Sequence, residues 1–186
     1  MLRTGDQYRD SLCDGREVWV DGKKVEDVTN HPVFKPIVDI RARIYDMAHE
    51  EKFREQLTYI DETSGEKNCI GSKLPKTKSD WLSKRQAIKT IMYEIGAVVT
   101  RVGDETVGEM WSLYDGTDIL NKVDPRFGDN IANHIQKVLE SDTFHVSGNT
   151  DPKGDRSKLP QEQDPDMLLH AVKETDKGIV VRGAKY

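Results

Sequence analysis

The chain has 186 residues, of which 33% are charged and 35% are hydrophobic, and its formal net charge is -5. This length supports one domain or slightly more, and the spread of aromatic residues argues against wholesale disorder. The charges are interspersed without a basic stripe, which argues against nucleic acid as the main partner. No stretch is apolar enough to span a membrane, and the N-terminus lacks the apolar segment of a signal peptide. We therefore expect a cytoplasmic protein with two reduced cysteines, Cys13 and Cys69.

The first predicted elements are a short helix and a β-hairpin. Residues 8–12 have the pattern of a short amphipathic helix. In residues 17–25, alternating side chains flank Asp21-Gly22, and a type I′ turn requires positive φ at both central positions. This segment therefore predicts a two-stranded ribbon, which must pack on other parts of the chain because such a ribbon alone is marginally stable.

Two longer helices are expected on either side of a loop. The first begins at Thr29 and runs to about Glu50, with an apolar stripe formed by Val33, Ile37, Ile40, Ile44 and Met47. Residues 58–78 are rich in turn formers and are predicted to be a loop or a poorly paired segment. Ser79 and Asp80 are expected to cap the second helix, whose broad apolar face starts at Trp81 and includes Val98, Val99 and Val102.

The apolar periodicity continues to an aromatic helix end at Trp111 and Tyr114, where Asp115-Gly116 interrupts it. We expect these rings to pack in the core, with the lining of a pocket as the alternative interpretation. A further helix is predicted from a cap at Asp129 or Asn130 to about residue 142.

The composition changes near residue 143, and the last segments are strand-like. Residues 167–172 alternate in polarity, and residues 178–184 are rich in β-branched side chains, with a charged turn expected between them at 173–177. Two strands are too few for an independent sheet. We therefore predict a helical domain at 1–142 and the start of a β domain at 143–186, completed by a longer chain or a partner chain.

Residues 149–156 form the most distinctive loop of the sequence. Pro152 and Gly154 favour a turn, and Lys153 and Arg156 can present positive charge to an anion such as a phosphate. The neighbouring carboxylates can instead neutralise both cations, which would leave an ordinary solvated turn. His145 precedes this loop and is a candidate acid, base or hydrogen-bond donor, with a structural histidine as the alternative.

Three blocks of the sequence carry a family resemblance: residues 10–32, residues 150–156 and residues 178–185. The first block closely resembles the opening of the 4-hydroxyphenylacetate 3-monooxygenase family. The other two resemble later parts of the same family, and they are equally similar to the related 4-hydroxybutyryl-CoA dehydratases and vinylacetyl-CoA isomerases. Because the blocks keep the family's order, the resemblance covers the whole chain.

The resemblance implies a fold that is mostly α. An acyl-CoA-dehydrogenase-like helical N-terminal domain, here with a small β-hairpin, would precede a middle β domain and a C-terminal helical bundle. Members are usually homotetramers, and their FAD lies between the last two domains. By resemblance, the cofactor-binding residues of this chain are Lys153, Gly154, Asp155 and Arg156, with Thr150, Asp151 and Pro152 as neighbours.

The sequence departs from the family in its substrate-binding pair, in the spacing between its catalytic histidine and the Asp-Arg of the cofactor loop, and in its iron–sulfur ligands. Where the monooxygenases hold a substrate phenol with an arginine and a tyrosine, this chain has Ser112 and Gly116. Tyr114 is the candidate substitute, and His145 is the candidate for the family's catalytic histidine. The dehydratases bind an iron–sulfur cluster through two cysteines, and this chain has Val102 and Thr106 at the corresponding positions. We therefore expect no cluster and no metal site in this segment.

These features predict the N-terminal part of a flavin-dependent aromatic hydroxylase that uses O₂ and reduced FAD supplied by a separate reductase. The expected substrate is a small aromatic molecule. One alternative is a dehydratase- or isomerase-like protein that acts on an acyl-CoA without the iron–sulfur ligands. Another is a non-catalytic assembly subunit that requires a C-terminal partner chain.

Overall fold

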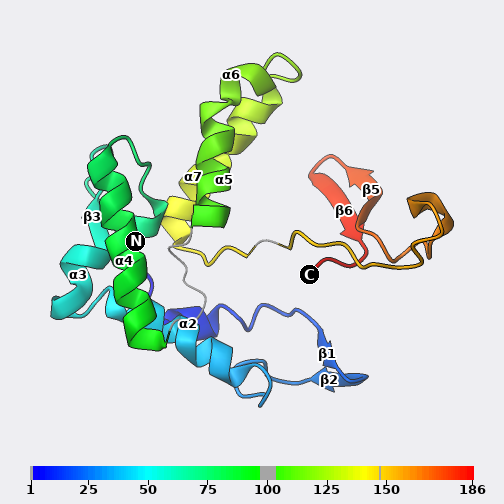
Figure 1. Cartoon of the computed structure of the whole chain (residues 1–186), viewed down its shortest axis with the longest axis horizontal. Helices are drawn as coiled ribbons and strands as arrows, with labels where there is room; N and C mark the ends of the chain where they lie inside the picture. The colour runs from blue at the N-terminus through cyan, green and yellow to red at the C-terminus, as the bar shows by residue number, and fades with distance from the viewer. Residues whose placement is uncertain (1, 97–103, 147) are drawn as a thin grey trace. The chain divides into compact units, whose positions relative to one another are not determined.

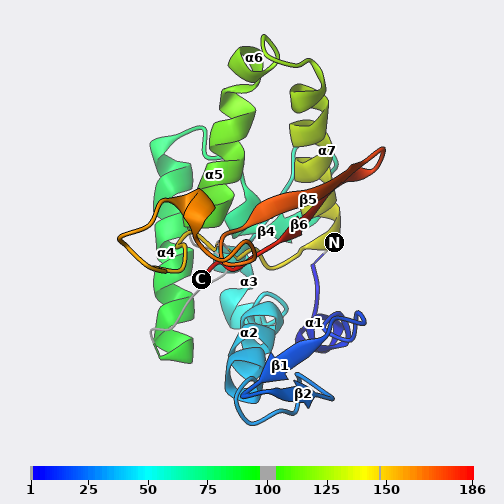
Figure 2. The same cartoon turned by 90° about the vertical axis from the view of Figure 1, so that its right-hand side faces the viewer.

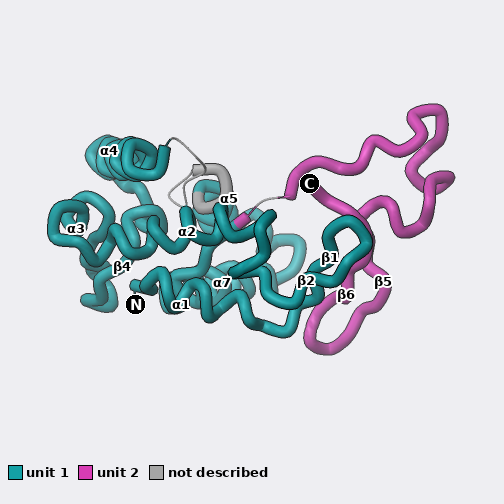
Figure 3. The backbone as a smooth tube through the Cα atoms, turned by 90° about the horizontal axis from the view of Figure 1, so that it is seen from below, with its two compact units in different colours: residues 1–145 teal, residues 146–186 magenta. Residues whose placement is uncertain are grey.

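The computed structural model describes residues 2–96, 104–146 and 148–186, and it divides into two compact units, 1–145 and 146–186 (Figure 1; Figure 3). The predicted apolar positions Val98, Val99 and Val102 lie outside the described residues. The described elements are mostly helices, with small antiparallel strand pairs, as predicted. The assignment of 1–142 and 143–186 as domains stays a prediction.

The N-terminal helix α1 (Gly5–Asp10) begins at a capping box, in which Thr4 and Gln7 satisfy each other's backbone N–H groups. The predicted hairpin follows as β1 (Val18–Val20) and β2 (Lys23–Val25), which pair antiparallel. Asp21 and Gly22 have φ values of 49° and 73°. The expectation of positive φ at both central turn positions is therefore confirmed.

Helix α2 (Lys35–Met47) begins later than the predicted start at Thr29. The Thr29 backbone N–H and hydroxyl both donate to Asp27, so Thr29 forms a local turn instead of a helix cap. The helix starts after Phe34, with a proline in its first turn. Val33 therefore precedes the helix and is 60% exposed, whereas Ile44 and Met47 of the predicted stripe are buried.

The prediction for residues 58–78 was wrong for its first half. After α3 (Glu51–Leu57), the strands β3 (Thr58–Ile60) and β4 (Lys67–Cys69) form an antiparallel hairpin, followed by the short helix η1 (Ile70–Ser72). The Asp61 carboxylate closes the turn by accepting the backbone N–H groups of Thr63 and Ser64. Asn68, Cys69 and Ile70 are buried, so tertiary packing orders a segment that local turn propensity presents as a loop.

Helix α4 (Lys78–Ile95) is capped by Thr77, with Asp80 completing a capping box, so the predicted cap was shifted by two residues. Gly96 ends the helix with a φ of 82°. Helices α5 (Asp104–Asp115), α6 (Thr117–Leu120) and α7 (Arg126–Ser141) follow. Helix α7 begins three residues before the predicted cap at Asp129, directly after Pro125. Figures 1 and 2 both show α5 and α7 side by side.

Three hydrophobic clusters hold the described part of the first unit together. The largest joins α2, α3, η1 and α4, and the second packs α1 against α2. The third joins α5 to α7 through Met110, Ile135 and Val138, with Trp111 packed beside them. The aromatic end of α5 is therefore fixed against α7.

The second unit contains η2 (Pro160–Glu162) and the strands β5 (His170–Thr175) and β6 (Gly178–Arg182). The two strands pair antiparallel, with a register shift between Ala171 and Lys173. The turn between them is shorter than the predicted 173–177. Across both units, none of the helices in the described ranges combines the length and apolar character needed to cross a membrane.

Candidate functional site

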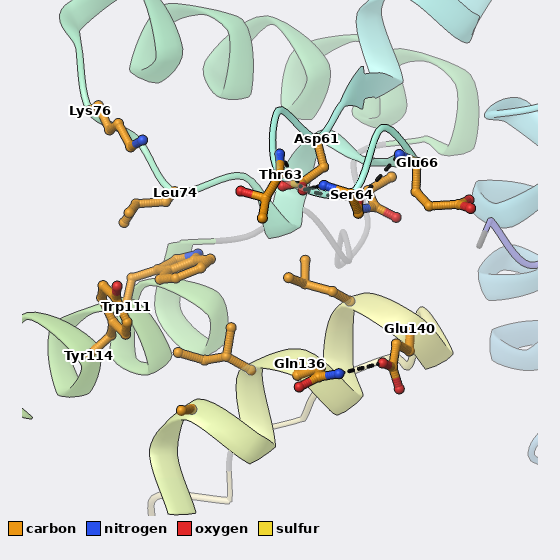
Figure 4. Close-up of a pocket in the computed structure, with 14 residues that line it drawn as sticks. Asp61, Thr63, Ser64, Glu66, Leu74, Lys76, Trp111, Tyr114, Gln136 and Glu140 are labelled. Atoms are coloured by element: carbon orange, nitrogen blue, oxygen red, sulfur yellow. Dashed lines mark hydrogen bonds between the residues drawn. The ribbon is translucent and has the colours of Figure 1, made fainter. Parts of the chain in front are cut away.

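A cleft of about 640 Å³ opens in the first unit between the β3–β4 turn and the helices α5 and α7. Figure 4 shows Asp61, Thr63 and Ser64 of the turn on one side of this cleft and Gln136 of α7 on the other. The ring of Trp111 extends from α5 toward the space between them. Residues 61–76 therefore form the cleft together with residues 111–140, which lie at least 35 positions later in the sequence.

Trp111 has two roles that the sequence presented as alternatives. Its ring packs beside the α5–α7 cluster, and it also lines the cleft. It lies 5.6 Å from the Tyr114 ring, centroid to centroid, at an interplanar angle of 87°. The indole Nε1 is buried and has no hydrogen-bond partner among the described residues. Tyr114 is 49% exposed and lines the same cleft.

The polar rim of the cleft is predominantly acidic. Asp61, Glu66 and Glu140 contribute carboxylates, and Lys76 contributes the one cation among the described lining residues. Hydrogen bonds donated by the backbone and hydroxyl of Ser64 lower the pKa of Asp61, so this carboxylate stays ionised at neutral pH.

His145 is the last residue of the first unit, and it is partly buried. Its ring lies 6.0 Å from the ring of His134 on α7, centroid to centroid. Among the described residues, the lining of the cleft includes Tyr114 and does not include His145.

The predicted cofactor loop lies in the second unit and is held at its start by the end of the chain. Thr150 and Tyr186 exchange two backbone hydrogen bonds of 2.8 and 3.0 Å. Asp151 forms an ion pair of 2.6 Å with Lys185, and the next residue, Pro152, is partly buried. These contacts fix the start of the loop, and the sequence gives no signal for them because the partners are about 35 positions apart.

The centre of the loop turns tightly at Gly154, which has a φ of 52°. A Cβ added there would lie 2.6 Å from the Met167 side chain. The next backbone N–H, that of Asp155, donates to Gln163, and the Gln163 amide donates back to the Asp155 carbonyl at 2.5 Å. Only glycine therefore fits this turn without rearrangement of its neighbours.

The carboxylates of Asp151 and Asp155 interact with groups other than Lys153 and Arg156. Asp155 accepts the N–H and hydroxyl of Ser157, which lowers the pKa of Asp155, and it lies 3.8 Å from Lys158. Lys153 and Arg156 are exposed, and neither forms an ion pair with any residue that the structure describes. The donor set fits an anionic group such as a phosphate, because two unpaired cations flank a glycine that lets the backbone approach a ligand.

Nearly the whole chain is similar to known proteins. Residues 4–186 match the family model described as 4-hydroxyphenylacetate 3-hydroxylase N terminal. The chain is 34% identical, over its full length, to the oxygenase component of 4-hydroxyphenylacetate 3-monooxygenase from Thermus thermophilus. It is 28% identical to 4-hydroxybutyryl-CoA dehydratase/vinylacetyl-CoA-Delta-isomerase from Clostridium aminobutyricum. In both comparisons the chain spans 38% of the relative's length.

Solved structures give the same result for the fold. A crystal structure of the oxygenase component of 4-hydroxyphenylacetate 3-monooxygenase, complexed with FAD and 4-hydroxyphenylacetate, matches with a TM-score of 0.77 at 32% identity. That match covers 98% of this chain and 38% of the other. An archaeal 4-hydroxybutyryl-CoA dehydratase from N. maritimus matches with a TM-score of 0.80 at 26% identity, covering 100% of this chain and 37% of the other.

The resemblance predicted from three sequence blocks is thus confirmed by a match that covers nearly the entire chain. Both branches of the predicted superfamily, monooxygenase and dehydratase, are found among the relatives. The chain belongs to the 4-hydroxyphenylacetate 3-hydroxylase family, and it corresponds to the N-terminal portion of the longer members.

Proposed function

We propose that this chain is the N-terminal part of the oxygenase component of a flavin-dependent monooxygenase that hydroxylates a small aromatic substrate. The observation that carries the proposal is the family match over residues 4–186. The relatives named as monooxygenases, and the FAD-bound structure among them, supply the reaction class and the cofactor. The remaining length of those relatives corresponds to further domains, which a longer chain or a partner chain would provide.

The loop at residues 150–156 is proposed to hold the diphosphate of FAD. Lys153 and Arg156 would bind phosphate oxygens, and Gly154 would let the backbone approach them. Asp151 and Asp155 are held by other groups, so they do not compete for the two cations. Reduced FAD, when bound, supplies the electrons that activate O₂, and a separate reductase would deliver it.

Substrate handling is assigned to the first unit. Tyr114 is the proposed substitute for the family's arginine–tyrosine pair, because it presents a phenol at the edge of the cleft. His145 is the proposed acid or base, in the role of the family's histidine. We also propose the acyl-CoA-dehydrogenase-like three-domain architecture, a homotetrameric assembly and a cytoplasmic location.

Arg156→Ala tests the cofactor assignment in the complete assembly. A hydrogen bond to a charged group is worth about 1.5–3 kcal/mol, so FAD affinity should fall roughly tenfold or more. Arg182→Ala is the matched control, because Arg182 lies in the same unit but is already paired with Asp166 at 2.7 Å. Titration of FAD into both variants measures the effect. An unchanged affinity in Arg156→Ala would show that the loop is only a turn.

A dehydratase-like function is the second candidate, because the N. maritimus dehydratase matches this chain with a TM-score of 0.80. Consumption of O₂ by the assembly with reduced FAD and a phenol supports the monooxygenase. Conversion of 4-hydroxybutyryl-CoA without O₂ supports the dehydratase. A non-catalytic assembly subunit, the third candidate, would show neither reaction when combined with any chain that co-purifies with it.

A further inference from the structure

We propose that Arg41 of α2 is a positioning residue for His145. Its guanidinium stacks on the ring of Phe144 and so holds the backbone from which the next side chain, the His145 imidazole, extends. The consequence for catalysis rests on the proposed function, in which His145 is the acid or base. The positioning itself requires neither flavin nor substrate.

Arg41 is a partly buried cation without a carboxylate partner. It forms no ion pair with any residue that the structure describes, and its Nε atom is buried without a hydrogen-bond partner there. Two positions later on the same helix, Arg43 pairs with Glu50 and Glu94. Because a cation loses hydration when it is buried, the contacts that Arg41 does make have to compensate for that loss.

Phe144 provides the contact that Arg41 makes. The Arg41 Cζ atom lies 4.5 Å from the centroid of the Phe144 ring, a distance at which the negative face of the ring attracts a cation. The Tyr8 ring lies 6.5 Å from the same ring, centroid to centroid, and Phe144 packs against the cluster that joins α1 to α2. A cation and an aromatic ring therefore both hold Phe144 on the α1–α2 pair.

Asp142 is a second anchor, two residues before Phe144. It ends α7 in the left-handed conformation, with a φ of 47°. Its carbonyl accepts a hydrogen bond of 2.8 Å from the Tyr45 hydroxyl, and its carboxylate accepts one of 2.9 Å from the Arg3 backbone N–H. Tyr45 lies one helical turn after Arg41, so both side chains belong to the same face of α2. This face therefore anchors the chain at residues 142 and 144.

His145 directly follows the two anchored residues. Its ring lies 6.0 Å from the ring of His134 on α7, centroid to centroid. Because Phe144 is the preceding residue, a shift of the stack moves the backbone of His145 as well. Proton transfer requires hydrogen-bond geometry, and a misplacement of about 1 Å can reduce a rate about 100-fold. Arg41 can thus influence the chemistry of His145 through Phe144.

The first measurement uses the full 186-residue chain without flavin. An NOE between the imidazole protons of His134 and His145 reports the position of the His145 ring. Arg41→Met keeps an unbranched side chain but removes the cation, so it should lose most of this NOE. Arg41→Lys keeps a cation for the Phe144 ring and should retain it.

Arg43→Met is the matched control on the same helix. Arg43 pairs with Glu50 and Glu94, and its Cζ atom lies 5.9 Å from the centroid of the Phe53 ring. These partners lie outside residues 142–145. Arg43→Met should therefore remove a cation from α2 at a cost in stability while leaving the His134–His145 NOE as strong as in the parent chain.

The second measurement is steady-state kinetics of the complete assembly with reduced FAD and a phenol. Arg41→Met should lower kcat by about 10- to 100-fold. It should leave KM for the phenol nearly unchanged, because a displaced acid or base affects the reaction step more than binding. Arg41→Lys should keep most of the activity, and Arg43→Met should keep kcat. A merely structural role of Arg41 would reduce the amount of folded protein without changing kcat per folded assembly.

Two results would each overturn the inference: an equally strong NOE in Arg41→Met and the parent chain, or an unchanged kcat of Arg41→Met in an active assembly. Phe144→Leu removes the other half of the stack and should have the same effects, so it decides the question if Arg41→Met fails to fold. An assembly that is inactive even with the parent chain would refute the proposed function, while the NOE would still decide the positioning. An unchanged NOE beside normal parent activity would refute the positioning alone.

Discussion

Gly5 is the position where a single methyl group should disturb the first unit most clearly. It is the first residue of α1, it is buried, and its backbone N–H donates to the Asp46 carboxylate at 2.6 Å. A Cβ at this position would lie 2.5 Å from Asp46 Oδ2 and 2.7 Å from the carbonyl oxygen of Ala42. The Asp46 side chain can rotate away, but the Ala42 carbonyl belongs to the α2 backbone, so Gly5→Ala must push the two helices apart.

The expected cost of Gly5→Ala follows from this geometry. Overpacking of a well-fitted contact costs about 1–3 kcal/mol. The gain in helix propensity from Gly to Ala is at most about 1 kcal/mol in a helix interior, and it is smaller at a first position. We therefore expect the free energy of unfolding of the first unit to fall by about 1–3 kcal/mol.

Urea unfolding monitored by tryptophan fluorescence measures this change, because Trp19, Trp81 and Trp111 all lie in the first unit. Gly108→Ala is the control: Gly108 lies in α5, and an added Cβ there meets no described atom within 4 Å. It should leave stability unchanged or raise it by about 0.5–1 kcal/mol. If both variants are as stable as the parent chain, α1 does not pack on α2 as closely as the structure describes.

Two further predictions concern acid stability and thiol reactivity. Hydrogen bonds from Lys73 and Thr77 lower the pKa of Asp80 in the folded chain. The ionised Asp80 carboxylate therefore contributes fully to the free energy of unfolding above the unfolded-state pKa of about 4, and this contribution is lost as the pH falls through the folded-state pKa. The stability difference between the parent chain and Asp80→Asn should therefore be full at pH 7 and shrink below pH 4 in unfolding titrations. Cys13 is exposed and Cys69 is buried, so a thiol reagent should modify one cysteine rapidly in the native chain and both after unfolding; two rapid reactions would contradict the packing of β4.

Local chemistry explains which elements the sequence could predict. The β1–β2 hairpin was predicted because Asp21-Gly22 satisfies the turn without help from the rest of the chain. Helix starts were less accurate, because several residues near each start can accept the first N–H groups. At α2 the Asp27 side chain takes the Thr29 donors, and at α4 Thr77 and Asp80 form the cap in place of Ser79.

The β3–β4 hairpin could not be predicted because its stability comes from distant residues. Cys69, at the end of β4, packs in the core with residues of α2 and α4. Just after this strand, the Gly71 carbonyl accepts a hydrogen bond of 2.9 Å from the Lys84 ammonium. Neither interaction leaves a periodic signal within residues 58–78. Long-range packing therefore overrides a local composition that is typical of a loop.

In the candidate sites, too, the sequence revealed the residue types but not the contacts between residues that are far apart in the chain. The cations at Lys153 and Arg156 were visible in the sequence, whereas the engagement of Asp151 by Lys185 was not. The aromatic helix end at Trp111 was also visible. The acidic rim around it, and the lack of a hydrogen-bond partner for its N–H among the described residues, became evident only from the placement of the β3–β4 turn and α7.

The two sites carry opposite charge, and this has a consequence for a reaction that needs both a cofactor and a substrate. Lys153 and Arg156 of the loop in the second unit form no ion pair with any described residue, so the proposed FAD site would attract an anionic dinucleotide. The described rim of the cleft in the first unit carries three carboxylates and one lysine, so the proposed substrate site would repel the same dinucleotide. Neither ligand is expected to compete strongly for the other's site, because occupying the wrong one places like charges together. Electrostatic complementarity can therefore sort cofactor and substrate between the two units.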